Sequence, residues 1–186
     1  MPLGPWREDS ECFTSVFDAY HGEIYRYVAS RLDIGHADDL ASETFLVAYR
    51  GRTKFRGPDS QVRAWLYGIA TNLIRRHRRD EERKYRALTR AETLTWCGDE
   101  AGADEPALAK VGALNAQRTL AAALRSMGRG DRDVLLLVAL AELSYAEVAA
   151  ALNIPQGTVG SRLNRARTVV RDAFGGVDPT RDQTGG

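Results

Sequence analysis

The chain has few of the residues that build metal clusters or disulfide frameworks. Its 186 residues include two cysteines and three histidines. Cys12 and Cys97 lie far apart and belong to no Cys-x-x-Cys or Cys/His pattern. The spacing of His21, His36 and His77 fits no metal-ligand motif. We therefore expect two free thiols, no metal site and no cofactor.

Long apolar runs and a leader segment are also lacking. No stretch approaches the ~20 unbroken apolar residues that a membrane span needs. Residues 1–9 do not show the basic-then-apolar order of a signal peptide. These absences predict a cytoplasmic protein without membrane insertion, built as one domain or as two small ones.

Strand-like alternation is missing as well, and helical periodicity takes its place. Apolar residues recur at three- and four-residue steps from Phe13 to Leu32, as in an amphipathic helix. A second helix is expected over residues 37–50, with a core face formed by Leu40, Thr44, Phe45, Val47 and Ala48. A turn at residues 57–60 precedes a third helix, with Asp59 or Ser60 as its cap.

Charge is nearly balanced overall but unevenly distributed. The formal net charge is +1, which alone argues against a simple nucleic-acid binder. Residues 50–90, however, hold thirteen Lys or Arg and four acids, whereas residues 91–109 hold five acids and no Lys or Arg. The basic charge is therefore concentrated next to an acidic stretch rich in Gly and Ala, which we interpret as a linker.

The basic segment includes RAWLYGIATNLIRRHRR, residues 63–79. On a helix its apolar side chains gather on one side, while Gly68, Thr71, Asn72, Arg75 and Arg79 gather on the other. A polar face with a run of Arg, beside aromatic side chains, is typical of single-stranded DNA binding. The alternative is that Trp65 and Phe55 are ordinary core residues.

The C-terminal part predicts a helix-turn-helix. Ser144 and Glu147 form the pattern of a capping box, and Pro155 is suited to begin the next helix. Asp131 is expected as the N-cap of the preceding apolar, buried helix. The inward stripe of the last helix would be Val159, Leu163, Ala166 and Val170. Its outward side chains would enter a DNA groove; the alternative is a plain helical hairpin with a solvated Arg face.

Together these patterns predict an all-α protein of two small helical domains joined by a flexible acidic linker. The expected divisions are an N-terminal domain at 10–86, the linker at 87–118, a C-terminal helix-turn-helix domain at 119–175, and a flexible tail at 176–186.

The stretches ADDLASETFLVAYR, AWLYGIATNLIRRHRR and LSYAEVAAALNIPQGTVGSRLNRAR, in this order, resemble those of extracytoplasmic-function (ECF) sigma factors. These are two-domain promoter-specificity subunits of bacterial RNA polymerase. The resemblance implies binding to core polymerase, through the beta-prime clamp helices and the beta subunit, and to promoter DNA that is double-stranded upstream and single-stranded near the start. It also allows an anti-sigma factor as a partner, and it implies no catalytic residue.

The resemblance assigns three sets of residues. Core polymerase would be bound by Asp38, Asp39, Leu40, Glu43, Thr44, Phe45 and Tyr49. The minus-ten element would be recognised and melted by Lys54, Phe55, Arg56, Gln61, Arg63, Trp65, Asn72, Arg75, Arg76 and Arg79. The minus-thirty-five element would be contacted by Gln156, Thr158, Ser161, Arg162 and Arg165. At Gly160 the chain departs from the family, which often has a basic residue there.

The two elements are separated by roughly 17 base pairs in this family, which is about 60 Å at ~3.4 Å per step. A tether of ~30 residues can extend to ~100 Å, so simultaneous binding is geometrically allowed.

Three rival interpretations fit the sequence less well. An enzyme would have to use Asp38, Asp39, Glu43 and His36, but neighbouring positions on a helix do not face one another. A helix-turn-helix regulator acting without polymerase leaves the N-terminal domain unexplained. A decoy for an anti-sigma factor would usually carry a receiver domain, and no β/α alternation is present.

Overall fold

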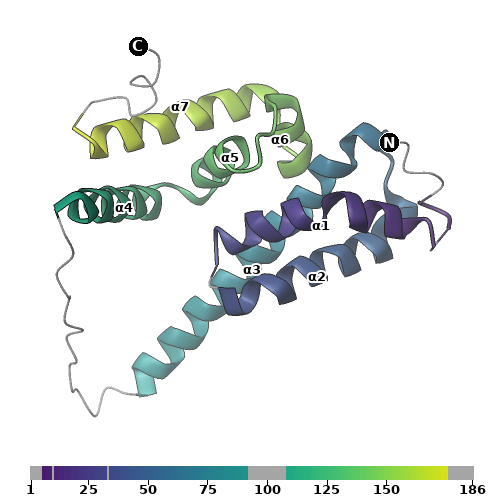
Figure 1. Cartoon of the computed structure of the whole chain (residues 1–186), viewed down its shortest axis with the longest axis horizontal. Coiled ribbons are helices and arrows are strands. Elements are labelled where there is room, and N and C mark those ends of the chain that lie inside the picture. Colours follow the sequence, from purple (N-terminus) through teal and green to yellow (C-terminus); the bar gives the residue numbers. More distant parts are fainter. Residues whose placement is uncertain (1–5, 10, 33, 92–107, 176–186) are drawn as a thin grey trace.

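The computed structural model describes residues 6–9, 11–32, 34–91 and 108–175 (Figure 1). All regular structure within these ranges is helical, as predicted. The helices are α1 (Phe13–Ala29), α2 (Ile34–Gly51), α3 (Val62–Ala91), α4 (Leu108–Ser126), α5 (Arg129–Ala139), α6 (Tyr145–Leu152) and α7 (Gln156–Ala173), with single 3₁₀ turns at Arg52–Lys54 and Asp59–Gln61. No described helix combines the length and the apolar composition that crossing a bilayer requires.

Helices α1, α2 and α3 form the N-terminal lobe. Their apolar stripes face inward, and Ile24, Val28, Leu66 and Ile74 are almost completely removed from solvent. Figure 1 shows α1 and α2 side by side, with α3 crossing them and extending beyond the lobe. The burial of these apolar stripes is the main stabilising term for such short helices.

Helices α4 to α7 form the C-terminal lobe, which contains the predicted helix-turn-helix. The Ser144 hydroxyl accepts from the backbone N–H of Glu147, and the Glu147 carboxylate accepts from the backbone N–H of Ser144, so the capping box is present. Asn153 ends α6 in the left-handed conformation (φ 50°), and α7 begins directly after Pro155. Val159 and Leu163 are buried as predicted.

Several helix boundaries differ from the prediction. Helix α3 continues to Ala91 and α4 begins at Leu108, so helix occupies both ends of the segment expected as linker; residues 92–107 lie outside the described ranges. Gly128, not Asp131, is the N-cap of α5. Asp131 lies in the first turn of α5, where its carboxylate is instead held by Arg165.

Two further expectations are corrected. Helix α5 is buried on one side only: Leu140, just past its end, is 48% exposed, whereas Asp133 within it is buried. Asp59 lies in the 3₁₀ turn before α3, and its carboxylate accepts from the indole N–H of Trp6 and pairs with Arg7. Asp59 and Asp131, which were both predicted as helix caps, therefore pair with arginines that are distant in the sequence.

The two lobes pack against each other, mainly through α3 and α6. At the closest approach Gly68 of α3 faces the backbone carbonyl of Ala151, and a Cβ at position 68 would lie 2.3 Å from that oxygen. Only glycine allows the helices to come this close. The lobes are therefore in direct contact in this structure rather than held apart by the tether.

Candidate nucleic-acid interface

The basic face of α3 remains partly open. Asn72, Arg76 and Arg79 are exposed along successive turns, and sequence periodicity predicted this for Asn72 and Arg79. Arg76 lies 4.0 Å from Asp80, and Arg79 donates to the backbone carbonyl of Arg75. These weak local contacts leave two guanidinium groups available for an anionic ligand such as a phosphate.

The loop before α3 offers further polar groups. The side chains of Lys54, Arg56 and Gln61 are exposed, as expected for groups that bind a nucleotide. Arg56 donates to the backbone carbonyl of Thr53, which restrains the loop locally.

The aromatic side chains beside this loop are partly buried. Phe55 and Trp65 pack against each other with ring centroids 4.8 Å apart, and both pack on Trp6. Trp6 is fully buried, and Arg7 lies over its ring. In this conformation Phe55 and Trp65 therefore pack as core residues, which was the alternative to their binding DNA. Sequence reasoning missed Trp6, because a single aromatic between prolines and charged residues carries no periodic signal.

Part of the α3 face expected to meet DNA is covered. Gly68 lies under α6, and Thr71 is buried, with its hydroxyl 2.9 Å from that of Tyr27. The prediction that these two residues face a nucleic acid is thus wrong for this arrangement of the lobes. Gly68 is covered by α6 of the C-terminal lobe, whereas Thr71 is covered within the N-terminal lobe by Tyr27 of α1.

An ionic cluster joins the lobes at this place. Asp133 of α5 accepts from Arg31 through one carboxylate oxygen and from Arg75 through the other, the second at 2.6 Å. The side chains of Arg31 and Asp133 are 2% and 3% exposed. Arg75, assigned to DNA from the sequence, is therefore held by the other lobe. No pattern in the sequence indicated that Arg75 would form an ion pair with Asp133, which is 58 residues away.

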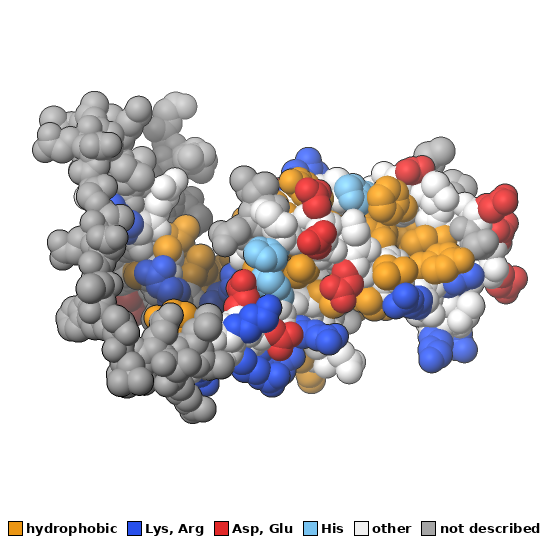
Figure 2. Space-filling model, turned by 90° about the horizontal axis from the view of Figure 1, so that it is seen from below, with side chains coloured by type: hydrophobic (Ala, Val, Ile, Leu, Met, Phe, Trp, Pro, Cys, Tyr) orange, Lys and Arg blue, Asp and Glu red, His pale blue; other side chains and the backbone are white. Residues whose placement is uncertain are grey.

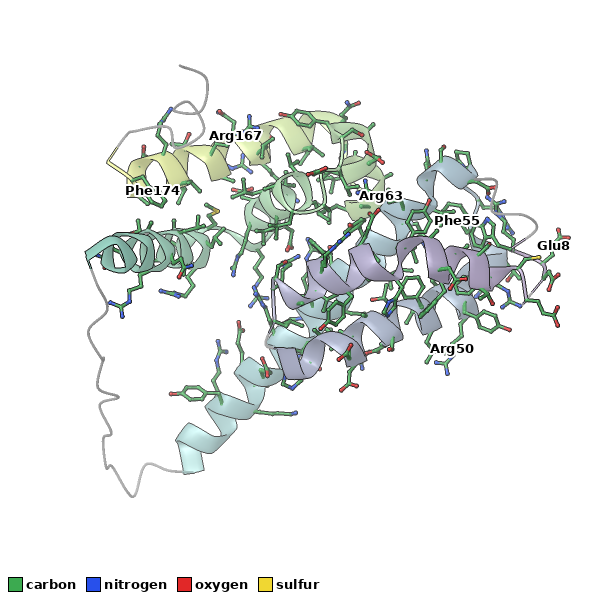
Figure 3. All side chains as sticks on the ribbon, viewed as in Figure 1. Glu8, Arg50, Phe55, Arg63, Arg167 and Phe174 are labelled. Carbon is green, nitrogen blue, oxygen red and sulfur yellow. The ribbon has the colours of Figure 1, made fainter. Side chains whose placement is uncertain are left out.

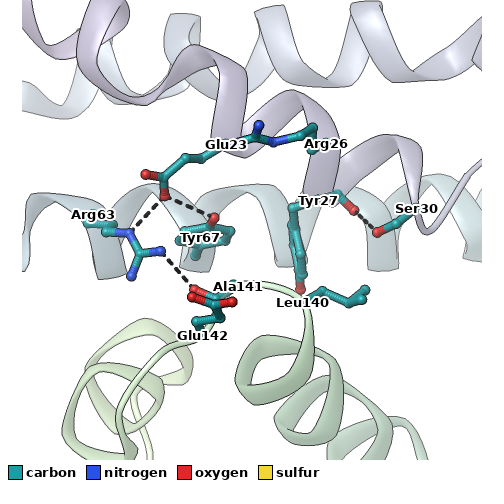
Figure 4. Close-up of a pocket in the computed structure, with 9 residues that line it drawn as sticks. All are labelled: Glu23, Arg26, Tyr27, Ser30, Arg63, Tyr67, Leu140, Ala141 and Glu142. Atoms are coloured by element: carbon teal, nitrogen blue, oxygen red, sulfur yellow. Dashed lines mark hydrogen bonds and ion pairs between the residues drawn. The ribbon is translucent and has the colours of Figure 1, made fainter.

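Arg63, also assigned to DNA, lies at the second contact between the lobes (Figure 3). It donates to the Glu23 carboxylate and to the backbone carbonyl of Ala141, both at 2.8 Å, at the edge of a pocket between the lobes (Figure 4). In the same pocket, burial and then the negative charge of Glu23 raise the pKa of Tyr67 to about 12. Tyr67 thus stays neutral and donates to Glu23.

The outward side chains of α7 are not all free. Gln156 and Ser161 are exposed, and Thr158 is partly buried. The guanidinium of Arg165 forms two 2.9 Å hydrogen bonds with Asp131, and the hydrogen bond from Arg165 holds the pKa of Asp131 below its usual range. Arg162 lies against Gly130 of α5. Both guanidiniums must turn away from α5 to reach a base edge.

The α2 residues predicted to bind polymerase divide into an exposed set and a buried set. Asp38, Asp39 and Glu43 are exposed, and Tyr49 is partly buried. Leu40, Thr44 and Phe45 are buried, so the structure places these three in the core rather than on the surface. Among the described side chains of this helix, the exposed apolar ones are Leu46 (46%), which sequence reasoning missed, and Val47 (38%), which the apolar pattern wrongly placed on the core face. Figure 2 shows apolar and acidic side chains together on one face of the molecule.

Comparison with known families matches both lobes. Residues 16–84 match Sigma-70 region 2, and residues 117–169 match Sigma-70, region 4. The chain is 36% identical over 170 residues to the ECF RNA polymerase sigma factor SigC of Mycobacterium tuberculosis, covering 90% of this chain and 85% of that one. It is 30% identical over 167 residues to the ECF RNA polymerase sigma factor SigW of Bacillus subtilis, covering 88% and 89%.

Solved structures agree on the fold. CnrH in complex with the cytosolic domain of CnrY gives a TM-score of 0.60 at 20% identity, with 90% of each chain covered. The sigma factor RpoE in complex with the anti-sigma factor NepR from Bartonella quintana gives 0.57 at 23% identity, covering 88% of this chain and 96% of that one.

Proposed function

The chain belongs to the extracytoplasmic-function sigma factors of RNA polymerase, and we propose that it binds core polymerase, recognises the minus-ten and minus-thirty-five elements and promotes promoter melting. The observation that carries this proposal is the exposed row of Asn72, Arg76 and Arg79 on α3, in the same chain as a helix-turn-helix. One lobe has the chemistry for a single strand and the other has the geometry for a duplex.

We infer that polymerase docks on α2. The surface comprises the carboxylates of Asp38, Asp39 and Glu43 together with the exposed Leu46 and Val47. An apolar centre with charged groups at its edge is the usual composition of a protein–protein interface. Leu40, Thr44 and Phe45 would support this surface from below, and the beta-prime clamp helices are the proposed partner.

For the minus-ten element, the proposed contacts are divided by accessibility. Lys54, Arg56 and Gln61 are available in the loop before α3, and they would capture an unstacked base. Arg76 and Arg79 would bind the strand backbone. Phe55, Trp65, Arg63 and Arg75 take part only after the contacts described above are rearranged.

For the minus-thirty-five element, α7 is the proposed recognition helix. Gln156, Thr158 and Ser161 offer hydrogen-bonding groups, and Arg162 and Arg165 offer guanidiniums for guanine edges or phosphates. The Arg165 side chain is 58% exposed, so its guanidinium can be reached by DNA and can exchange Asp131 for it.

Promoter binding requires the lobes to separate. The two elements lie about 60 Å apart along the DNA at ~3.4 Å per base pair, whereas α3 and α6 are in direct contact here. We therefore propose that this closed arrangement is a form of the free protein, and that the polymerase- and promoter-bound form has the Asp133 cluster broken.

The test is a pull-down of the purified protein with sigma-free bacterial core polymerase, followed by run-off transcription on a pool of promoter fragments. Core binding with transcripts that share two spaced elements is expected. Duplex DNA binding without core association would overturn the proposal in favour of a helix-turn-helix regulator that acts without polymerase.

A further inference from the structure

Two histidines that are distant in the sequence meet between α2 and α3. His36 lies in the first part of α2 and His77 lies in α3, with ring centroids 4.6 Å apart. The carboxylate of Glu81 lies 3.3 Å from Nε2 of His77. One ligand atom from each of the three residues falls within 4.8 Å of the others. In the part of the chain that the structure describes, these three side chains form a potential tridentate site.

We propose that His36, His77 and Glu81 bind a divalent transition-metal ion of the Zn²⁺ class. Two imidazoles and one carboxylate form a donor set that holds Zn²⁺ while leaving a fourth position for water. Imidazole ligands favour Zn²⁺, Ni²⁺, Cu²⁺ and Co²⁺ over Mg²⁺ or Ca²⁺, which prefer oxygen ligands. Nothing in the proposed function requires this ion.

The geometry needs only side-chain rotation. Ligands at 2.0–2.2 Å from a tetrahedral ion lie roughly 3.3–3.6 Å from one another. His77 and Glu81 already satisfy that separation, because positions i and i+4 are neighbours on a helix. His36 is exposed and Glu81 is about half exposed, so both can turn toward a common centre.

An ion pair between His77 and Glu81 explains only part of this arrangement. That pair uses one imidazole only, and it leaves unexplained why a second imidazole, tilted by 50°, lies 4.6 Å from the first between ring centroids. Two protonated imidazoles at this distance would repel each other. A shared metal ion uses both rings in their neutral form, so it accounts for all three side chains.

The surroundings of the site are cationic and only partly compensated. Arg31 and Arg78 line the same pocket. Arg31 pairs with Asp133, which is shared with Arg75, and Arg78 donates to the backbone carbonyl of Arg31 at 2.7 Å. Figure 2 shows imidazole side chains on a face that also carries acidic and basic groups. Glu81 supplies the negative charge within the ligand set itself.

A bound ion would link the beginning of α2 to the middle of α3. These elements are otherwise joined there by packing and by the Arg78 hydrogen bond to the residues that follow α1. Since the ion binds only the folded arrangement, it should raise the melting temperature by an amount that grows with the logarithm of the free-ion concentration above Kd.

The experiment is a titration of the full chain, freed of any affinity tag and of metal, with Co²⁺ and with Zn²⁺. Visible absorption of Co²⁺ reports tetrahedral coordination, and calorimetry gives the Zn²⁺ affinity. We expect one equivalent to bind and the melting temperature to rise by about 5–10 °C at a hundredfold excess over Kd. A background with Cys12→Ser and Cys97→Ser removes thiol ligands and is expected to bind equally well.

Two variants assign the ligands, and a third is the control. His36→Gln and His77→Gln should each weaken binding by at least ~10-fold, since even outer-shell changes cost that much. His21→Gln makes the same change at an imidazole stacked on Phe17, outside the cluster, and should leave binding unchanged. Helical circular dichroism of each metal-free variant verifies the fold. No saturable binding by the parent, or equal losses in all three variants, would overturn the proposal.

Discussion

At the scale of single residues, the free and the engaged arginines of α3 have different consequences. Arg76 and Arg79 are exposed, whereas Arg75 is fixed by the Asp133 carboxylate of the other lobe. A substitution at Arg75 would therefore change both DNA binding and the contact between the lobes. Substitutions at Arg76 and Asn72 should change DNA binding without changing the contact between the lobes.

The first prediction concerns this exposed row. Asn72→Ala with Arg76→Ala should reduce open-complex formation several-fold while leaving core-polymerase affinity unchanged. Loss of one phosphate contact should also reduce the salt slope of single-stranded binding by about 0.7. Permanganate footprinting and salt titration measure the two effects. Arg171→Ala, on α7, is the control; lost core binding with normal melting would refute the assigned role.

A second residue-scale prediction concerns the capping box. Ser144→Ala should destabilise the C-terminal lobe by about 1 kcal/mol, because it removes the group that binds the N–H of Glu147. Thermal unfolding measures this change. Ser161→Ala, at a hydroxyl that only bonds back to the carbonyl of Thr158, should leave stability nearly unchanged.

The capping box of Ser144 and Glu147 also makes the stability of the protein depend on pH. The Ser144 hydrogen bond holds the pKa of Glu147 below its ordinary value of 4.5. A lowered folded-state pKa means that this stabilisation is present above about pH 4.5 and is lost as the pH falls through the lowered pKa. In Ser144→Ala, NMR titration should show the pKa of Glu147 moving up; an unchanged value would contradict the assignment.

At the scale of elements, α7 contains a glycine that its packing does not need. A Cβ at Gly160 would meet no other atom within 4 Å, whereas one at Gly68 would clash with a backbone oxygen. Gly160→Ala should therefore stabilise the protein by roughly 0.5–1 kcal/mol, and raise the melting temperature by about 1–4 °C. A decrease measured by calorimetry would show that α7 needs flexibility there.

Helix α2 carries the prediction about polymerase. Leu46→Asp should weaken core binding by at least about tenfold, because it puts a charge into an apolar contact that excludes water. The fold should be unaffected, since Leu46 is 46% exposed. Leu120→Asp makes the same change on α4 at 40% exposure and is expected to have a smaller effect. Equal losses in fluorescence-based binding would remove α2 as the docking helix.

At the scale of the whole molecule, the contact between the lobes combines a close backbone approach with a buried ionic cluster. Removing one partner of a buried ion pair usually costs about 3–5 kcal/mol, because the remaining charge is left without compensation. Here Arg31 can regain water if the lobes separate. Opening, rather than unfolding, is therefore the expected response.

The last prediction follows from that contact. Asp133→Asn and, independently, Gly68→Ala should increase the radius of gyration in small-angle scattering and strengthen binding to single-stranded DNA, because both uncover the α3 face. Asp131→Asn, whose carboxylate pairs within the C-terminal lobe, should leave the dimensions unchanged. Both test variants remaining as compact as the parent would show that other contacts hold the lobes together.

The sequence alone determined the helical fold class, the helix-turn-helix, the capping box and the polar side of α3 on which Asn72 and Arg79 are exposed. These features depend on side chains one turn apart, and such neighbours can be identified from spacing. Tertiary structure alone decided that Trp6 is buried, that Val47 is exposed, that Arg31 meets Asp133 and that His36 meets His77. Those residues are brought together by the packing of separate helices, and no local pattern specifies which distant side chain will be the partner.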